Sequence, residues 1–115
     1  MTGLLPGSVR GTLPKLYATE HESDPLLRVK LFTPWTNWTW WIAEFDGEDI
    51  CFGLVQGFET ELGYFSLKEL EAIRGPGGLK IERDLHFEPV HLKTIRDSLD
   101  HRGTHPTLPY TGRDR

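Results

Sequence analysis

The sequence predicts an α+β domain, with a mostly antiparallel sheet of four to five strands and two or three helices packed on it. Three observations predict this class. Segments 38–45 and 50–56 are rich in aromatic and β-branched residues, and the turn 46–49 between them contains an Asp-Gly pair. Segments 66–74 and 89–99 have apolar residues at helical spacing. The length of 115 residues suits one domain.

Further strands are expected on either side of this hairpin. Apolar and polar residues alternate over 26–32, which predicts a strand before the tryptophan-rich segment. A shorter strand is expected over 62–65, and 79–84 alternates like a half-exposed edge strand. Two prolines interrupt 4–20, so this segment stays open between a loop and a short helical turn.

The segment 38–45 has apolar side chains on both predicted faces. Simple alternation places Trp38, Trp40, Ile42 and Glu44 on one face and Thr39, Trp41, Ala43 and Phe45 on the other. The next strand has the same property. We therefore expect a sheet that is covered on both sides, at least locally.

The two predicted helices have recognisable ends. Ser66 and Glu69 have the spacing of a capping box, and the run Arg74-Gly-Pro-Gly-Gly78 ends the first helix. Pro89 suits the first turn of the closing helix, whose apolar periodicity runs to about Leu99.

Composition bounds the class of protein. Hydrophobic residues make up 37% and charged residues 26%, which excludes a disordered chain and a membrane protein. Apolar periodicity ends near residue 99, so we expect one domain over 1–99 and a mobile tail over 100–115. The single cysteine, Cys51, excludes an internal disulfide. No signal peptide or membrane span is visible, and we expect a cytoplasmic protein.

The acidic residues are concentrated in one part of the chain. The formal charge of −4 comes from 13 basic and 17 acidic residues, the wrong sign for a dedicated nucleic-acid binder. Residues 37–72 contain one basic and eight acidic side chains, a net −7. Our acidic candidates for a binding surface all lie there: Asp46, Glu48, Asp49, Glu59 and Glu61. A solvated turn is the alternative explanation for the first three, because turns favour Asp on conformational grounds.

All four tryptophans lie between residues 35 and 41. Such rings stack on bases or sugars, bind cations, or anchor a protein partner. We take Trp35, Trp38 and Trp40 as candidate binding residues, with a purely structural role as the alternative. Trp41 alternates to the opposite face from Trp38 and Trp40, so at least one ring is expected to pack beneath a helix.

These candidates support three function hypotheses. The leading one is a non-enzymatic module that binds a protein with a basic patch through an acidic and aromatic surface. A metal-assisted hydrolase acting on nucleic acid or nucleotides would instead use Glu44, Asp46, Glu59 and Glu61 as ligands or base. Direct nucleic-acid binding requires an exposed stacking ring beside Arg or Lys. The histidines have no spacing typical of a metal site, and no cofactor, metal or catalytic residue is assigned.

Four motifs resemble a small bacterial family that is known only as a domain of unknown function. They are Leu31-Phe-Thr-Pro-Trp-Thr-Asn-Trp-Thr-Trp-Trp41, Glu44-Phe-Asp-Gly-Glu48, Phe52-Gly-Leu-Val-Gln-Gly-Phe-Glu59 and Glu61-Leu-Gly-Tyr-Phe-Ser-Leu67. The resemblance covers roughly residues 4–99 and implies no activity and no catalytic residue. It implies a genomic setting, because members are frequently encoded on plasmids and integrative elements, sometimes near antirestriction genes. A role in the maintenance, transfer or defence evasion of mobile DNA is therefore expected over a metabolic one.

Overall fold

The computed structural model describes residues 3–103 and confirms the α+β class. The main sheet is antiparallel and has five strands in the order β5-β4-β3-β2-β6. Its strands are β2 (Val29–Phe32), β3 (Thr39–Phe45), β4 (Ile50–Gln56), β5 (Thr60–Ser66) and β6 (Glu82–Arg83). A second sheet pairs the short strands β1 (Leu26–Leu27) and β7 (Val90–His91).

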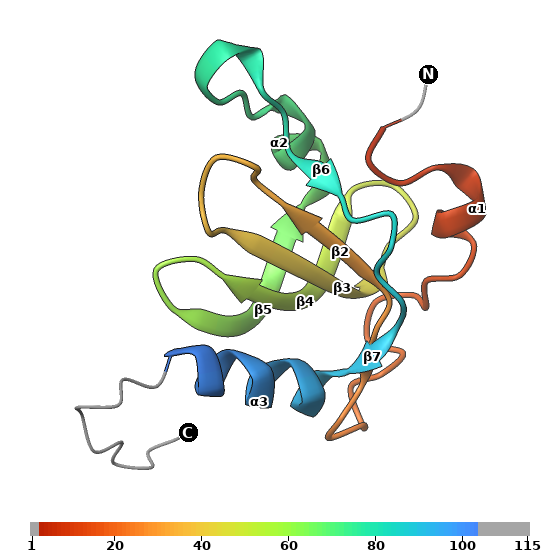
Figure 1. The fold of residues 1–115 in the computed structure, drawn as a ribbon. Coiled ribbons are helices and arrows are strands. Elements are labelled where there is room, and N and C mark those ends of the chain that lie inside the picture. Colours follow the sequence, from red (N-terminus) through yellow and green to blue (C-terminus); the bar gives the residue numbers. More distant parts are fainter. Residues whose placement is uncertain (1–2, 104–115) are drawn as a thin grey trace.

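Helices lie on both sides of the main sheet. They are α1 (Gly7–Arg10), α2 (Leu67–Ala72), the 3-10 turn η1 (Pro76–Gly78) and α3 (Leu92–Gly103). Figure 1 shows α3 along one side of the sheet and α2 on the opposite side. The expectation that the sheet is covered on both sides is therefore confirmed. Within residues 3–103, no helix has the length and apolar character needed to cross a membrane.

Two hydrophobic cores result from this arrangement. The larger one, which we call the α2 core, contains Leu5, Val29, Leu31, Trp40, Ile42, Phe45, Cys51, Leu67, Leu70 and Ile81. The smaller one, the α3 core, contains Leu27, Trp41, Ala43, Leu54 and Leu92 and is extended by the half-buried Phe87 and by Ile95 and Leu99. Trp40 and Trp41 are adjacent in β3 and so enter different cores.

A β-bulge changes the faces of β3. The pairing of β3 with β4 shifts register between Ile42 and Glu44, which leaves Ala43 as an extra residue. An extra residue reverses the alternation of the side chains that follow it. Phe45 therefore joins Ile42 in the α2 core, whereas Glu44 faces a cavity that Leu92 of α3 also lines. The simple alternation predicted for this strand holds as far as Ala43 and is wrong for Glu44 and Phe45.

The ends of the helices differ in how well they could be predicted. The Ser66 hydroxyl accepts a hydrogen bond from the Glu69 amide at 3.1 Å, which confirms the predicted cap of α2. The prediction that the last helix begins near residue 89 is wrong, because Val90 pairs with Leu27 in a strand and α3 begins at Leu92. Helix α3 continues to Gly103, and the rest of the predicted tail, 104–115, lies outside the described residues.

Candidate functional site

The acidic turn between β3 and β4 is organised by two aspartates. One carboxylate oxygen of Asp46 accepts hydrogen bonds from the amides of Glu48, Asp49 and Ile50, at 2.8, 2.7 and 3.1 Å. The Asp49 carboxylate accepts hydrogen bonds from the Ser66 hydroxyl and from the amide of Lys68 in the first turn of α2, at 2.8 Å each. Both carboxylates therefore have structural partners, whereas Glu48 is exposed.

These hydrogen bonds favour the charged form of each aspartate. The amides of Asp49 and Glu48 lower the pKa of Asp46 below its ordinary value of 3.8. The Lys68 amide and then the Ser66 hydroxyl lower the pKa of Asp49 in the same direction. The turn therefore keeps its negative charge over the whole neutral range.

Glu44 is buried and does not contribute to the acidic surface. Its side chain is 2% exposed. One carboxylate oxygen accepts a hydrogen bond from the Tyr17 amide at 2.7 Å, and the other accepts hydrogen bonds from the Thr19 amide at 2.9 Å and from the Thr19 hydroxyl. Glu44 thus fixes the loop before β1, in which Tyr17 has a positive φ of 72°.

The structure does not bring the acidic candidates together. Asp46, Glu48 and Asp49 precede β4, while Glu59 and Glu61 follow it, so the two groups lie at opposite ends of a seven-residue strand. At ~3.3 Å per residue, this separation is roughly 20 Å. Among the side chains of residues 3–100, which the structure describes, no group of three or more His, Cys, Asp or Glu has the geometry to hold a metal ion. The convergence of carboxylates that the hydrolase alternative requires is not found.

The tryptophan candidates also separate. Trp40 is 6% exposed and lies in the α2 core. Trp35 is half-buried and packs closely on Gly75, where a Cβ atom would lie 2.3 Å from the ring. Trp38 is half-buried, with its ring centroid 5.8 Å from that of Trp40 and 5.4 Å from that of Phe58. Of the three, Trp38 is the residue that lines both of the surface hollows described next.

The first hollow lies over the turn between β4 and β5, and we call it the hairpin groove. It has a volume of about 460 Å³ and is lined by Trp38, Val55, Gly57, Phe58, Glu59, Glu61, Leu62, Gly63 and Tyr64. Phe58 is 95% exposed and meets the Trp38 ring edge-on. Glu59 and Glu61 are exposed and form no ion pair with any residue that the structure describes.

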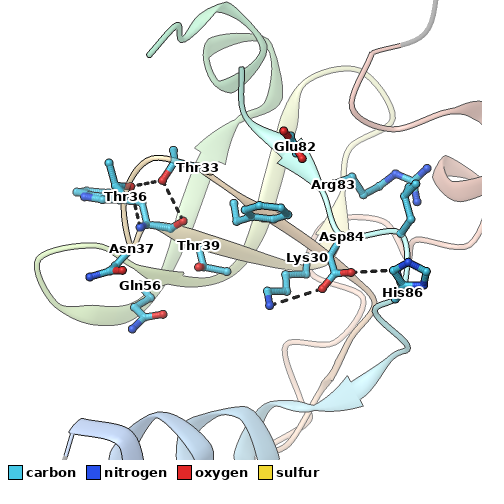
Figure 2. Close-up of a pocket in the computed structure, with 13 residues that line it drawn as sticks. Lys30, Thr33, Thr36, Asn37, Thr39, Gln56, Glu82, Arg83, Asp84 and His86 are labelled. Carbon is cyan, nitrogen blue, oxygen red and sulfur yellow. Dashed lines mark hydrogen bonds and ion pairs between the residues drawn. The ribbon is translucent and has the colours of Figure 1, made fainter. Parts of the chain in front are cut away.

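The second hollow is a cleft on the α3 side of the sheet, which we call the sheet cleft (Figure 2). It has a volume of about 690 Å³ and is lined by Lys30, Phe32, Thr33, Thr36, Asn37, Trp38, Thr39, Gln56, Glu82, Arg83, Asp84, Leu85 and His86. The β2–β3 turn bounds one end and the segment after β6 bounds the other. Two hydrogen bonds hold the shape of this turn, one between the hydroxyls of Thr33 and Thr36 and one from the Trp38 amide to the Thr36 hydroxyl at 3.0 Å.

Our sequence analysis did not select Phe58, Thr39 or Gln56. Phe58 lies in a turn between Gly57 and Glu59, where an aromatic side chain has no core to pack into. This pattern is visible in the sequence, so Phe58 could have been selected from it. Thr39 is the first residue of β3 and Gln56 the last residue of β4, and the two pair with each other. That pairing depends on the hairpin register, which the sequence alone does not specify.

The structure is thus a small α+β domain with two surface hollows, and Trp38 lines both of them. Residues 8–97 match the model of the DUF2958 family, described as a protein of unknown function. The chain therefore belongs to this family. No curated protein and no solved structure matches it.

Proposed function

We propose that this chain is a binding module that captures a basic segment of a partner protein in the hairpin groove. The observation that carries the proposal is Phe58, which is 95% exposed at the tip of the hairpin while Trp38 supports one edge of its ring. Exposed aromatic side chains held in place by a second ring are typical of interface anchors. Leaving such a ring in water has a free-energy cost, which contact with a partner relieves.

The charge around this ring selects the partner. Glu59 and Glu61 flank it and have no described ion-pair partner, so their carboxylates remain available to a cation. An Arg or Lys side chain in the groove would meet aromatic faces and carboxylates together, and each of these interactions is favourable for a cation. The partner surface is therefore basic.

The open edge of the sheet favours a protein over other macromolecules. Strand β5 is at one end of the main sheet, and β4 is its neighbour there. An extended peptide can add to such an edge through backbone hydrogen bonds and place alternate side chains in the adjoining groove. Gly63 leaves the middle of this edge unobstructed, since nothing lies within 4 Å of where its Cβ would be. The proposed setting is a mobile genetic element, as the resemblance of the motifs implies.

Site-specific photo-crosslinking in the native host tests the proposal. We would place a photoreactive phenylalanine at position 58 and, as a matched control, at Leu79, which is 44% exposed away from the groove. The expected result is one crosslinked adduct from position 58, which maps to an Arg- or Lys-rich segment of the partner. Position 79 should give no adduct of the same mass. The double variant Glu59→Lys, Glu61→Lys should abolish the adduct. An adduct that survives this charge reversal, or no adduct at position 58, would overturn the proposal.

A further inference from the structure

The sheet cleft has a lining suited to a different ligand from that of the hairpin groove. Helix α3 covers the part of this sheet face around Trp41 and Leu54. The neighbouring part, with Phe32, Thr39 and Gln56, is left as the floor of the cleft. A volume of about 690 Å³ is within the usual range for small-molecule sites.

Three polar groups in the cleft have no partner among the described residues. The Thr39 side chain belongs to a residue that is only 8% exposed, and its hydroxyl lines the cleft without a described hydrogen bond. The amide of Gln56, directly opposite Thr39 in the sheet, and the amide of Asn37 in the turn are also without one. These groups are open to the cleft, so a ligand seated there can replace their water with direct hydrogen bonds.

Three of the four Lys, Arg, Asp and Glu side chains in the cleft have described partners, and the fourth, Glu82, is exposed and has none. Lys30 lies 3.6 Å from one oxygen of Asp84, and the other oxygen accepts a hydrogen bond from the His86 amide at 2.9 Å (Figure 2). Arg83 donates from its Nε to the Leu4 carbonyl oxygen at 3.1 Å. Lys30 and Arg83 are balanced in charge by Asp84 and Glu82, so the lining has no net positive charge for a phosphate. Besides Glu82, the groups that remain are neutral amides, a hydroxyl and the ring of Phe32.

That set of groups matches the chemistry of a nucleobase. The aromatic ring of Phe32 offers a stacking surface for a flat heterocycle. A side-chain amide pairs with the adjacent donor and acceptor on a base edge, as Asn and Gln do with adenine. A neighbouring hydroxyl, which donates or accepts, extends that pattern.

We propose that the sheet cleft binds a nucleobase, stacked on Phe32 and hydrogen-bonded by Thr39 and Gln56. The base would come from a free nucleoside or from a single-stranded nucleic acid. This inference is independent of the hairpin groove, and its failure would leave the proposed protein partner untouched.

Titration of the intact chain followed by amide NMR shifts tests this inference. The probes are the common nucleosides, the corresponding monophosphates, ribose alone and short single-stranded oligonucleotides. We expect saturable shifts confined to the cleft with at least one nucleoside, none with ribose, and an affinity that hardly changes with salt because the site is neutral. If the oligonucleotides bind and the nucleosides do not, the inference stands with single strands as the source, provided that the variants below weaken that binding.

Thr39→Val keeps the shape of the side chain and removes its hydroxyl, and we expect it to weaken binding about tenfold. Gln56→Leu, at a half-exposed position, serves as a second variant if Thr39→Val is poorly folded. Thr60→Val, on the exposed edge strand, is the control and should bind like the wild type. Binding of ribose alone, binding unaffected by Thr39→Val and Gln56→Leu, or no binding by any probe would overturn the inference.

Discussion

Gly53 and Gly63 lie directly opposite each other in β4 and β5, yet only Gly53 has no room for a side chain. A Cβ atom at Gly53 would lie 1.7 Å from the Trp41 carbonyl oxygen, whereas nothing lies within 4 Å of that position at Gly63. Gly53 pairs with Ile42, immediately before the bulge. The absence of a side chain there therefore lets β3 approach closely where it changes faces.

This difference predicts opposite outcomes for one substitution. Gly53→Ala should lower the free energy of unfolding by about 2–3 kcal/mol, because backbone has to move to admit the methyl group. Gly63→Ala should change it by less than about 0.5 kcal/mol. Urea unfolding of both variants measures the two values. Equal effects would show that the close approach at Gly53 does not constrain the bulge.

The position of Glu44 after the bulge predicts a stability role. Glu44→Gln removes one acceptor oxygen and places an NH₂ group against the donors of Tyr17 or Thr19. We expect a loss of about 2–4 kcal/mol in the free energy of unfolding, since the donors are left unsatisfied in a buried place. Glu48→Gln is the matched control, because that side chain is exposed. Urea unfolding decides the matter, and a Glu44→Gln variant as stable as the control would refute this role.

Much of the fold could be predicted because its evidence is local. The hairpin strand 50–56 and the cap at Ser66 depend on neighbouring residues, and both have the predicted form. The face on which Glu44 lies depends on the bulge, which is a single extra residue of β3 in its pairing with β4. The alternation of residue types along β3 does not indicate this bulge. Val90 fits a helix by spacing, but its pairing with Leu27, far away in the sequence, makes it a strand residue.

The candidate site was harder to predict for a related reason. A cluster of acidic residues in the sequence is not a cluster in space when a strand separates its members, as β4 separates Asp49 from Glu59. Composition likewise does not distinguish a carboxylate that caps a helix from one that is free to bind. Trp38 could be selected from its residue type, but its contact with Phe58 depends on how the two hairpin turns meet.

The acidic turn predicts how stability depends on pH. The hydrogen bonds to Asp46 and Asp49 lower both pKa values in the folded state, while the unfolded chain keeps ordinary values near 3.8. The stabilisation is therefore complete above that pH and is lost as the pH falls towards the folded-state pKa, because the unfolded state takes up protons first. Asp46→Asn should thus lose less stability than the wild type between about pH 7 and about pH 3.

Urea unfolding at the two pH values measures this difference. Glu48→Gln, whose side chain has no described hydrogen-bond partner, should retain the acid dependence of the wild type. The hypothesis fails if Asp46→Asn and the wild type lose stability equally on acidification.

The single cysteine should be unreactive in the folded protein. Burial, with smaller contributions from Asp49 and Asp46, raises the pKa of Cys51 to about 12, so the thiolate is scarce at neutral pH. A thiol-specific chromogenic reagent should react only at the rate at which the chain opens, and rapidly in concentrated urea. Because the folded pKa is raised above 9.0, Cys51 should also make the fold less stable as the pH rises above that value. Rapid labelling under native conditions would contradict the burial of this thiol.

Trp38 borders both hollows, which predicts that disturbing its ring affects both sites. A Cβ atom at Gly57 would lie 2.4 Å from the Trp38 ring, so Gly57→Ala should displace the indole. We expect amide NMR shifts at Phe58 in the hairpin groove and also at Thr39 in the sheet cleft, because Trp38 lines both hollows. Phe58→Ala is the control, because Phe58 lines only the groove, and its shifts should stop short of Thr39. Shifts confined to the groove in both variants would show that Trp38 does not connect the two sites.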